Sequence, residues 1–215
     1  MKVSVLYFAV FRERIGRDAE TCRPKTFAVA HLGSQLAPRV APPQYEAFHI
    51  LHTGNLYKGQ SWAPVMQGLR LFLQRTPQAR GLVRLTQVGW SHGDLETWSI
   101  RCDLQDVVQI AGRRTQAEVV AMLDTASLLL ALDYERPDST TVLSKLPDYV
   151  AAGRPILAIT APGTSMAQLF NQDGGGLTAH YGSPEEAAQR IGTVFEAWQQ
   201  RRLELRDVHQ RHYRV

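Results

Sequence analysis

Short apolar runs alternate with helix-like patterns along most of the sequence, and this alternation restricts the chain to a few folds. FHILHTG at 48–54 is an apolar run closed by glycine, and in SWAPVMQGLRLFLQRTP at 61–77 the apolar residues recur at helical spacing. SLLLALD at 127–133 is typical of a strand buried on both faces of a parallel sheet. Patterns that alternate from residue 48 to 200 predict an α/β fold, a Rossmann-like doubly wound parallel sheet.

The remaining elements follow from apolar runs and from helix-capping signals. Residues 90–105 show no clear pattern, whereas further strands are predicted at 82–89, 106–112, 154–160 and 176–181. T-Q-A-E from Thr115 and S-P-E-E from Ser183 have the capping-box form, in which a glutamate three residues on completes the cap. We predict helix N-caps at Ser61, Thr115, Ser144 and Ser183.

The chain divides into three parts by composition. Residues 1–45 form an N-terminal extension and linker, in which a strand at 3–10 and a polar helix precede a proline-containing stretch without clear period. Residues 46–200 carry the predicted Rossmann-like domain, and residues 201–215 form a basic C-terminal tail.

Composition narrows the function classes. The net charge of +4 is spread along the chain and the tryptophans do not alternate with basic residues, so no nucleic-acid partner is expected. Cys22 and Cys102 form no CxxC pattern and the histidines have no metal-ligand spacing, which indicates neither a disulfide framework nor a metal site and fits a reducing cytoplasm. No apolar run approaches the ~20 residues that span a bilayer, so we expect a soluble cytoplasmic protein, at most peripheral to a membrane.

The loop after the first strand, T-G-N-L-Y-K-G-Q, has residues suited to a phosphate ligand. Ligands of doubly wound sheets bind outside the carboxyl ends of the strands. Gly54 and Gly59 allow close backbone approach, and Lys58 offers a point charge. The loop has neither the Walker A nor the GxGxxG form, so an ordinary strand-to-helix turn with a solvated lysine remains the alternative.

SKLPDYVAAGRPILAI at 144–159 places polar residues before a buried strand. With Ser144 as the N-cap, Lys145 and Pro147 lie in the first turn of a helix, whose free N–H groups and dipole favour a phosphate. Asp148 in the same turn either complements the dipole or accepts hydrogen bonds from ligand hydroxyls, and both roles stay open.

Three segments, HTGNLYKG, AGRRTQAEVVAMLDTASLLLAL and SKLPDYVAAGRPILAI, resemble the C-terminal, donor-binding half of GT-B glycosyltransferases. The similarity covers residues 46–198 and is to the large retaining, family-4-like group of bacterial polysaccharide and lipid glycosyltransferases. It implies binding of a nucleotide-sugar of UDP or GDP type and transfer of its sugar to an acceptor hydroxyl, with no cofactor and usually no metal. It identifies no catalytic residue in this chain.

The resemblance implies donor contacts. The diphosphate would meet Gly54, Lys58 and Gln60, although many relatives carry arginine where Gln60 stands. Asp148 matches the acid that binds the ribose, and aspartate stands there in place of the commoner glutamate.

Three further positions carry over less directly. An upstream acidic partner of Asp148, which addresses the donor sugar in the family, would fall at Thr140 and is absent. Lys145, next to Ser144, is a second phosphate ligand, and Arg113 lies where relatives place a base-contacting loop.

The N-terminus carries a second resemblance. MKVSVLYFAVFRERIGRDAE is similar to the start of the sulfur-carrier subunit of molybdopterin synthase, but the chain ends HYRV in place of the Gly-Gly that sulfur transfer needs. Residues 1–45 are also too few for an acceptor-binding Rossmann half. Two classes therefore stay open: a glycosyltransferase whose acceptor half is supplied by another chain or domain, and a non-catalytic nucleotide-sugar-binding module or degenerate remnant.

Overall fold

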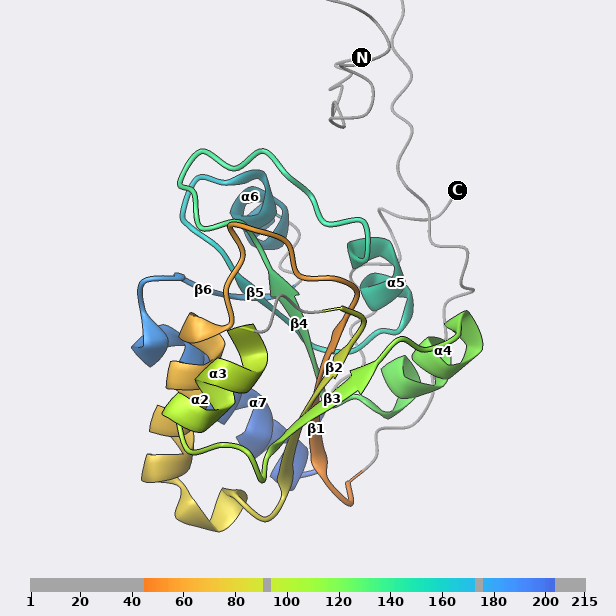
Figure 1. The fold of residues 1–215 in the computed structure, drawn as a ribbon, viewed down its shortest axis with the longest axis vertical. Coiled ribbons are helices and arrows are strands. Elements are labelled where there is room, and N and C mark those ends of the chain that lie inside the picture. The colour runs from red at the N-terminus through yellow and green to blue at the C-terminus, as the bar shows by residue number, and fades with distance from the viewer. Residues whose placement is uncertain (1–44, 91–93, 173–175, 204–215) are drawn as a thin grey trace, which may run out of the picture.

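A single sheet of six parallel strands forms the centre of the molecule (Figure 1). The computed structural model describes residues 45–90, 94–172 and 176–203. The strand order is β3-β2-β1-β4-β5-β6, so the direction of winding reverses between β1 and β4, and the predicted Rossmann-like doubly wound sheet is confirmed. The strands are β1 Phe48–Thr53, β2 Val83–Val88, β3 Val108–Gly112, β4 Leu128–Leu132, β5 Ile156–Ile159 and β6 Leu177–Ala179.

Helices cover both faces of the sheet (Figure 1). One face packs against α2 Ala63–Arg75, α3 Asp94–Arg101 and α7 Pro184–Gln199. The other packs against α4 Gln116–Thr125, α5 Leu146–Ala151 and α6 Ser165–Gln172, and a short 3₁₀ helix, η1 Pro77–Ala79, follows α2. Helix α3 occupies the stretch in which the sequence shows no clear pattern.

The two faces of the sheet carry separate apolar cores. Ile50 packs in the core under α2 and α7, while its neighbour Leu51 packs in the core under α4, α5 and α6, because consecutive side chains of a strand point to opposite faces. The rings of Phe48 and Phe195 meet edge to face, with centroids 5.3 Å apart, and join β1 to α7. Burial on both sides explains why β4 and β5 are apolar throughout.

Two of the four predicted caps are confirmed. The Thr115 hydroxyl accepts the Glu118 N–H at 3.3 Å while the Glu118 carboxylate accepts the Thr115 N–H at 2.7 Å, which completes the capping box of α4. Ser183 caps α7 by accepting the N–H of Glu186. The Glu186 carboxylate does not complete the predicted box. It accepts the N–H of His180 at 2.8 Å and so ties the helix to the preceding turn, while the Ser183 N–H donates to the carbonyl of His180 at 2.9 Å.

The predicted N-cap at Ser144 was wrong, and the predicted cap at Ser61 is confirmed in part. The assigned cap positions are Trp62 and Lys145, one residue later, and neither side chain makes a capping bond. The Ser61 hydroxyl still accepts the N–H of Ala63 at 3.0 Å. A carboxylate distant in sequence adds to this cap: Asp94 accepts the Trp62 N–H at 3.0 Å and the Ser61 hydroxyl at 3.2 Å. Local sequence carries no sign of this long-range partner.

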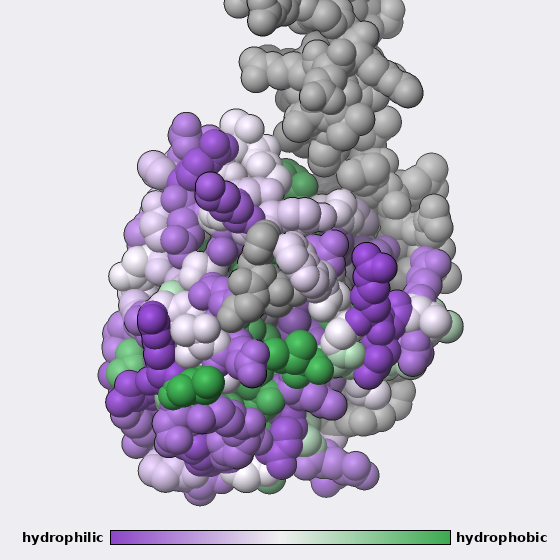
Figure 2. Space-filling model, viewed as in Figure 1, coloured by the Kyte–Doolittle hydropathy of each residue, from purple (hydrophilic) through white to green (hydrophobic). Residues whose placement is uncertain are grey.

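Edge strand β3 and helix α3 leave apolar side chains at the surface. Ile110 of β3 is 51% exposed and Ile100 of α3 is 60% exposed. Figure 2 shows a largely hydrophilic face on which hydrophobic atoms gather over these two elements. None of the helices in the described ranges is both long and apolar enough to cross a bilayer.

Three earlier predictions lie outside the described residues: the strand and helix of the N-terminal extension, the likeness of this segment to a sulfur carrier, and most of the basic tail. The division of the chain into 1–45, 46–200 and 201–215 stays a prediction.

Candidate functional site

The loops after β1 and β4 meet at the point where the winding of the sheet reverses. The Glu135 N–H donates to the carbonyl of Gly59 at 2.8 Å, and the Gln60 side-chain amide donates to the carbonyl of Leu132 at 2.6 Å. A Cβ atom on Gly59 would lie 3.2 Å from the ring of Tyr134. The two loops therefore form one wall of backbone and side chains above the carboxyl ends of the central strands, where doubly wound folds bind ligands.

Three glycines with positive φ end the neighbouring strands β1, β2 and β3. The φ angles of Gly54, Gly89 and Gly112 are 94°, 106° and 67°. The Gly54 N–H donates to the carbonyl of Val88, and the Gly89 N–H donates to that of Gly112, each at 2.8 Å. A Cβ on Gly89 would lie 2.7 Å from the carbonyl oxygen of Gly54, so only glycine permits this close approach of the loops.

A chain of hydrogen bonds leads from β2 to the loop before α5. The Gln87 amide NH₂ donates to the carbonyls of Gly54 at 2.9 Å and Val88 at 3.0 Å, and its oxygen lies 2.5 Å from Nδ1 of His52. Nε2 of the same ring lies 2.8 Å from Nζ of Lys145. Gln87 and His52 thus connect the strand ends to an amine that lies beside Gly54.

Burial sets the charge states of this chain. The His52 ring is fully buried, and burial together with the nearby Lys145 holds its pKa well below 6.5, so the ring is neutral at physiological pH. Burial also lowers the pKa of Lys145 from 10.5 to about 7. Near neutral pH this amine exists in both protonation states, and an anion placed beside it favours the protonated one.

Helix α5 is held against the end of β1 by a buried tyrosine. The Tyr149 hydroxyl accepts the N–H of Thr53 at 2.8 Å, and burial raises the pKa of Tyr149 to about 12. Tyr149 lies four residues after Lys145 in a short helix, so this bond also places Lys145 relative to the loop at Gly54.

A buried carboxylate holds the loops after β4 and β5 together. Asp133 accepts hydrogen bonds from the hydroxyls of Thr160 at 2.7 Å and Ser139 at 3.1 Å, and from the N–H of Tyr134 at 2.8 Å. Burial raises the pKa of Asp133 above its ordinary value. This network supports the chain that leads from β4 to Lys145.

The structure brings together only some of the predicted donor contacts. A Cβ on Gly54 would lie 3.4 Å from Nζ of Lys145, so these two positions are adjacent. Gln60 lies in the same loop, but its side chain bonds to Leu132 and, at 2.9 Å, to the N–H of Tyr57.

The other predicted contacts surround this pair less closely. Lys58 is exposed in the same loop as Gly54, and Ser144 is exposed directly before Lys145. Asp148 is half-buried in the first turn of α5. Arg113 is exposed on the loop after β3, which β2 separates from β1. The donor role of all these residues stays a prediction.

The sequence alone places His52 at the end of the first strand, either near a donor phosphate or, more readily, as a core histidine, and it gives Gln87 no role. A signal for them exists, because H-T-G at 52–54 and Q-V-G at 87–89 end neighbouring strands in the same way. The structure pairs His52 with Gln87 in register. Polar residues at equivalent positions near the carboxyl ends of two neighbouring strands indicate a hydrogen bond between their side chains.

The reversal of the sheet between β1 and β4 carries two amines of a kind suited to an anion. The half-buried Lys145 lies beside Gly54, and the exposed Lys58 lies in the loop after β1. Within residues 45–90, 94–172 and 176–203, no three His, Cys, Asp or Glu side chains gather into a set for a metal ion.

Comparison with protein families decides the identity of this fold. Residues 47–197 match the family described as glycosyl transferases group 1. The chain belongs to this family. A comparison with curated proteins finds no match to the chain.

Solved structures of other proteins share the architecture of this group 1 domain. Anabaena HepE, solved in complex with UDP, superposes with a TM-score of 0.59 at 18% identity, covering 77% of this chain and 43% of HepE. WaaG, a glycosyltransferase involved in lipopolysaccharide biosynthesis, superposes with a TM-score of 0.62 at 15% identity, covering 79% of this chain and 43% of WaaG. The chain therefore spans less than half of the length of these proteins.

A third neighbour shows which half is present. The C-terminal domain of LpcC, a group 1 glycosyl transferase of Francisella tularensis, superposes with a TM-score of 0.59 at 12% identity. The match covers 78% of this chain and 87% of that isolated domain. The expected C-terminal half of a GT-B fold is thereby confirmed.

Proposed function

We propose that this domain binds the diphosphate of a nucleotide-sugar in the crevice between β1 and β4 and presents the sugar for transfer to an acceptor hydroxyl. The observation that carries the proposal is the Lys145 amine, which is half-buried beside Gly54 at the reversal of the sheet. A protein holds a costly half-buried amine most readily where an anion binds.

The proposed chemistry is electrostatic. As the bond between sugar and diphosphate breaks, negative charge grows on the departing nucleoside diphosphate, and a preorganised cation stabilises that charge more than it stabilises the ground state. Lys145 supplies this cation from one side of the crevice, and exposed Lys58 supplies a second from the loop after β1. Asp148 would bind the ribose hydroxyls and Arg113 would approach the base.

Four further features extend the proposal. HepE was solved with UDP and with UDP-glucose, so we propose a UDP-type donor first and a GDP-type donor second. We also propose retention of configuration at the donor sugar, an acceptor-binding half in another domain or chain, and a cytoplasmic location, which the two separate cysteines fit.

Calorimetry with the full chain tests the binding step. UDP, GDP and UDP-glucose are titrated alongside uridine, which has the base and ribose but no phosphate. We expect the diphosphates to bind and uridine to bind far more weakly. If neither diphosphate binds, the proposed function fails.

A non-catalytic binding module is the second candidate. Gln60, which occupies a diphosphate-contacting position in the family, uses its side chain to brace the loop, and Thr140 stands where an acid is expected. Consumption of a nucleotide-sugar in the presence of an acceptor half separates the two: binding with no release of nucleoside diphosphate supports the module, and release supports the enzyme.

A further inference from the structure

The hydrogen bonds of Gln87 allow one orientation of its side-chain amide. Its NH₂ group faces two carbonyl oxygens, those of Gly54 and Val88, and its oxygen faces Nδ1 of His52. A flipped amide would set its oxygen against both carbonyl oxygens, and each carbonyl would lose this donor. The orientation therefore follows from the backbone of the two strand ends.

The orientation of Gln87 determines the tautomer of His52. An amide oxygen only accepts, so Nδ1 of His52 must carry the proton. In a neutral ring the other nitrogen, Nε2, then has a lone pair and only accepts. That lone pair faces Nζ of Lys145 at 2.8 Å, so the amine donates.

The ring itself has little freedom to move. His52 is fully buried on β1, in register with Gln87 on β2, and packs edge to face on Trp62 with ring centroids 5.1 Å apart. Lysine by contrast has a long flexible side chain. Where no contact holds it in the free protein, the entropy lost when it becomes ordered weakens ligand binding.

We propose that His52, held by Gln87, is a positioning residue that fixes the Lys145 amine beside Gly54 before the diphosphate arrives. The inference rests on the proposed function, because Lys145 is the residue that meets the diphosphate there. His52 accepts from the amine through a nitrogen that carries no proton, and so orients the remaining N–H groups of Lys145 without neutralising its charge.

A double-mutant cycle measures this role in UDP binding. We expect His52→Leu to weaken UDP about three- to tenfold, the range for releasing one ordered side chain. In a Lys145→Met background the same change must have no further effect, because His52 acts only through the amine. An undiminished effect of His52→Leu in that background overturns the proposal.

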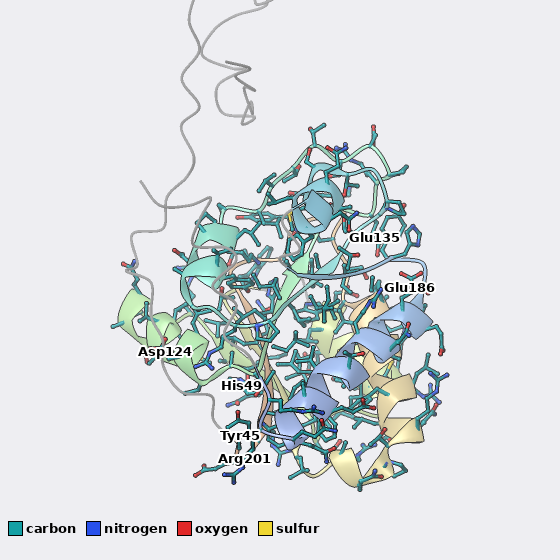
Figure 3. All side chains as sticks on the ribbon, turned by 180° about the vertical axis from the view of Figure 1, so that it is seen from behind. Tyr45, His49, Asp124, Glu135, Glu186 and Arg201 are labelled. Carbon is teal, nitrogen blue, oxygen red and sulfur yellow. The ribbon has the colours of Figure 1, made fainter. Side chains whose placement is uncertain are left out.

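His49 supplies a matched control on the same strand. Its Nε2 bonds to Thr86 of β2 at 2.9 Å, which is also a cross-strand contact of a histidine ring. Figure 3 shows His49 toward one end of the molecule and Glu135, on the loop after β4, toward the other. His49→Leu must leave UDP affinity unchanged, and a loss equal to that of His52→Leu overturns the proposal.

A ligand-free measurement separates this proposal from the proposed function. In nitrogen NMR spectra of the full chain, the His52 ring, identified by the loss of its signals in His52→Leu, must show a proton on Nδ1 and none on Nε2. Lys145→Met must shift the Nε2 resonance. In Gln87→Met the proton of the His52 ring must no longer be confined to Nδ1. A proton on Nε2 in the wild type overturns the positioning role, whereas failure of UDP and GDP to bind while the tautomer is as stated overturns only the function.

Discussion

Nζ of Lys145 lies 2.8 Å from Nε2 of His52, where the loop before α5 meets the end of β1. The contact joins an amine to a neutral ring, so the protein orients the charge of Lys145 here without neutralising it. The half-buried cation is costly in the empty domain and is compensated when an anion binds beside it. Three of the four predictions below follow from this pair.

Lys145→Met should weaken nucleoside diphosphate binding about ten- to a hundredfold. A charge-assisted hydrogen bond contributes about 1.5 to 3 kcal/mol, which corresponds to this range of affinity. Calorimetry with UDP provides the measurement. Arg70→Met, which removes an exposed charge on α2, is the control, and an equal loss in both variants would show that only net charge matters.

The affinity for UDP-glucose should fall as the pH rises. The diphosphate diester stays ionised, His52 stays neutral because its pKa is well below 6.5, and Lys145 loses its proton near its pKa of about 7. If the protonated amine is the binding form, affinity drops about tenfold between pH 6 and pH 8. Lys145→Met should give a flat profile over this range, and a wild-type profile that is equally flat contradicts the prediction.

Lys145→Met should also stabilise the fold at neutral and mildly acidic pH. The unfolded chain keeps the Lys145 proton up to about 10.5 and the folded chain loses it near 7, so the free energy of unfolding rises with pH between these values. Removing the amine should raise the free energy of unfolding by about 1 kcal/mol at pH 6, where the buried charge is most destabilising. The loss of the hydrogen bond from Lys145 to His52 offsets part of this gain.

Denaturant unfolding of the full chain at pH 6 and pH 10 measures this difference. The gain of Lys145→Met over the wild type should shrink at the higher pH. A gain that is constant with pH would mean that the effect comes from packing of the methionine and has no link to the charge.

Gly89→Ala should destabilise the domain more than Gly112→Ala. Both glycines have positive φ, which costs about 1 kcal/mol for alanine. A Cβ on Gly89 also overlaps the Gly54 carbonyl at 2.7 Å, whereas no described atom lies within 4 Å of a Cβ on Gly112. We expect a loss of about 3 kcal/mol against about 1 kcal/mol in denaturant unfolding; similar losses would contradict the close approach of the strand ends.

Much of the fold could be predicted because its elements have local causes. Apolar runs such as 127–133 predict buried parallel strands, and the Thr115 and Glu118 box starts α4 as its spacing indicates. The cap at Ser144 could not be predicted correctly, and that at Ser61 only in part. The Ser61 hydroxyl accepts the Ala63 N–H, but the Trp62 N–H is satisfied by Asp94, more than thirty residues away.

The candidate site divides in the same way. The sequence indicated a glycine loop at Gly54 after a strand and Lys145 in the first turn of a helix, and its family follows from motifs of this kind. It could not show that Gln60 braces its own loop, or that His52 meets Lys145. These contacts depend on which carboxyl ends become neighbours.

The sequence by itself determined most of the elements, their parallel arrangement and the family, because periodicity, capping and turn chemistry act over a few residues. Only the tertiary structure decided the order of the strands, which places β1 between β2 and β4. That order sets Gln87 beside His52 and brings Lys145 to the ring. Side chains 35 and 93 residues from His52 thus act on one histidine, at distances along the chain over which no local pattern operates.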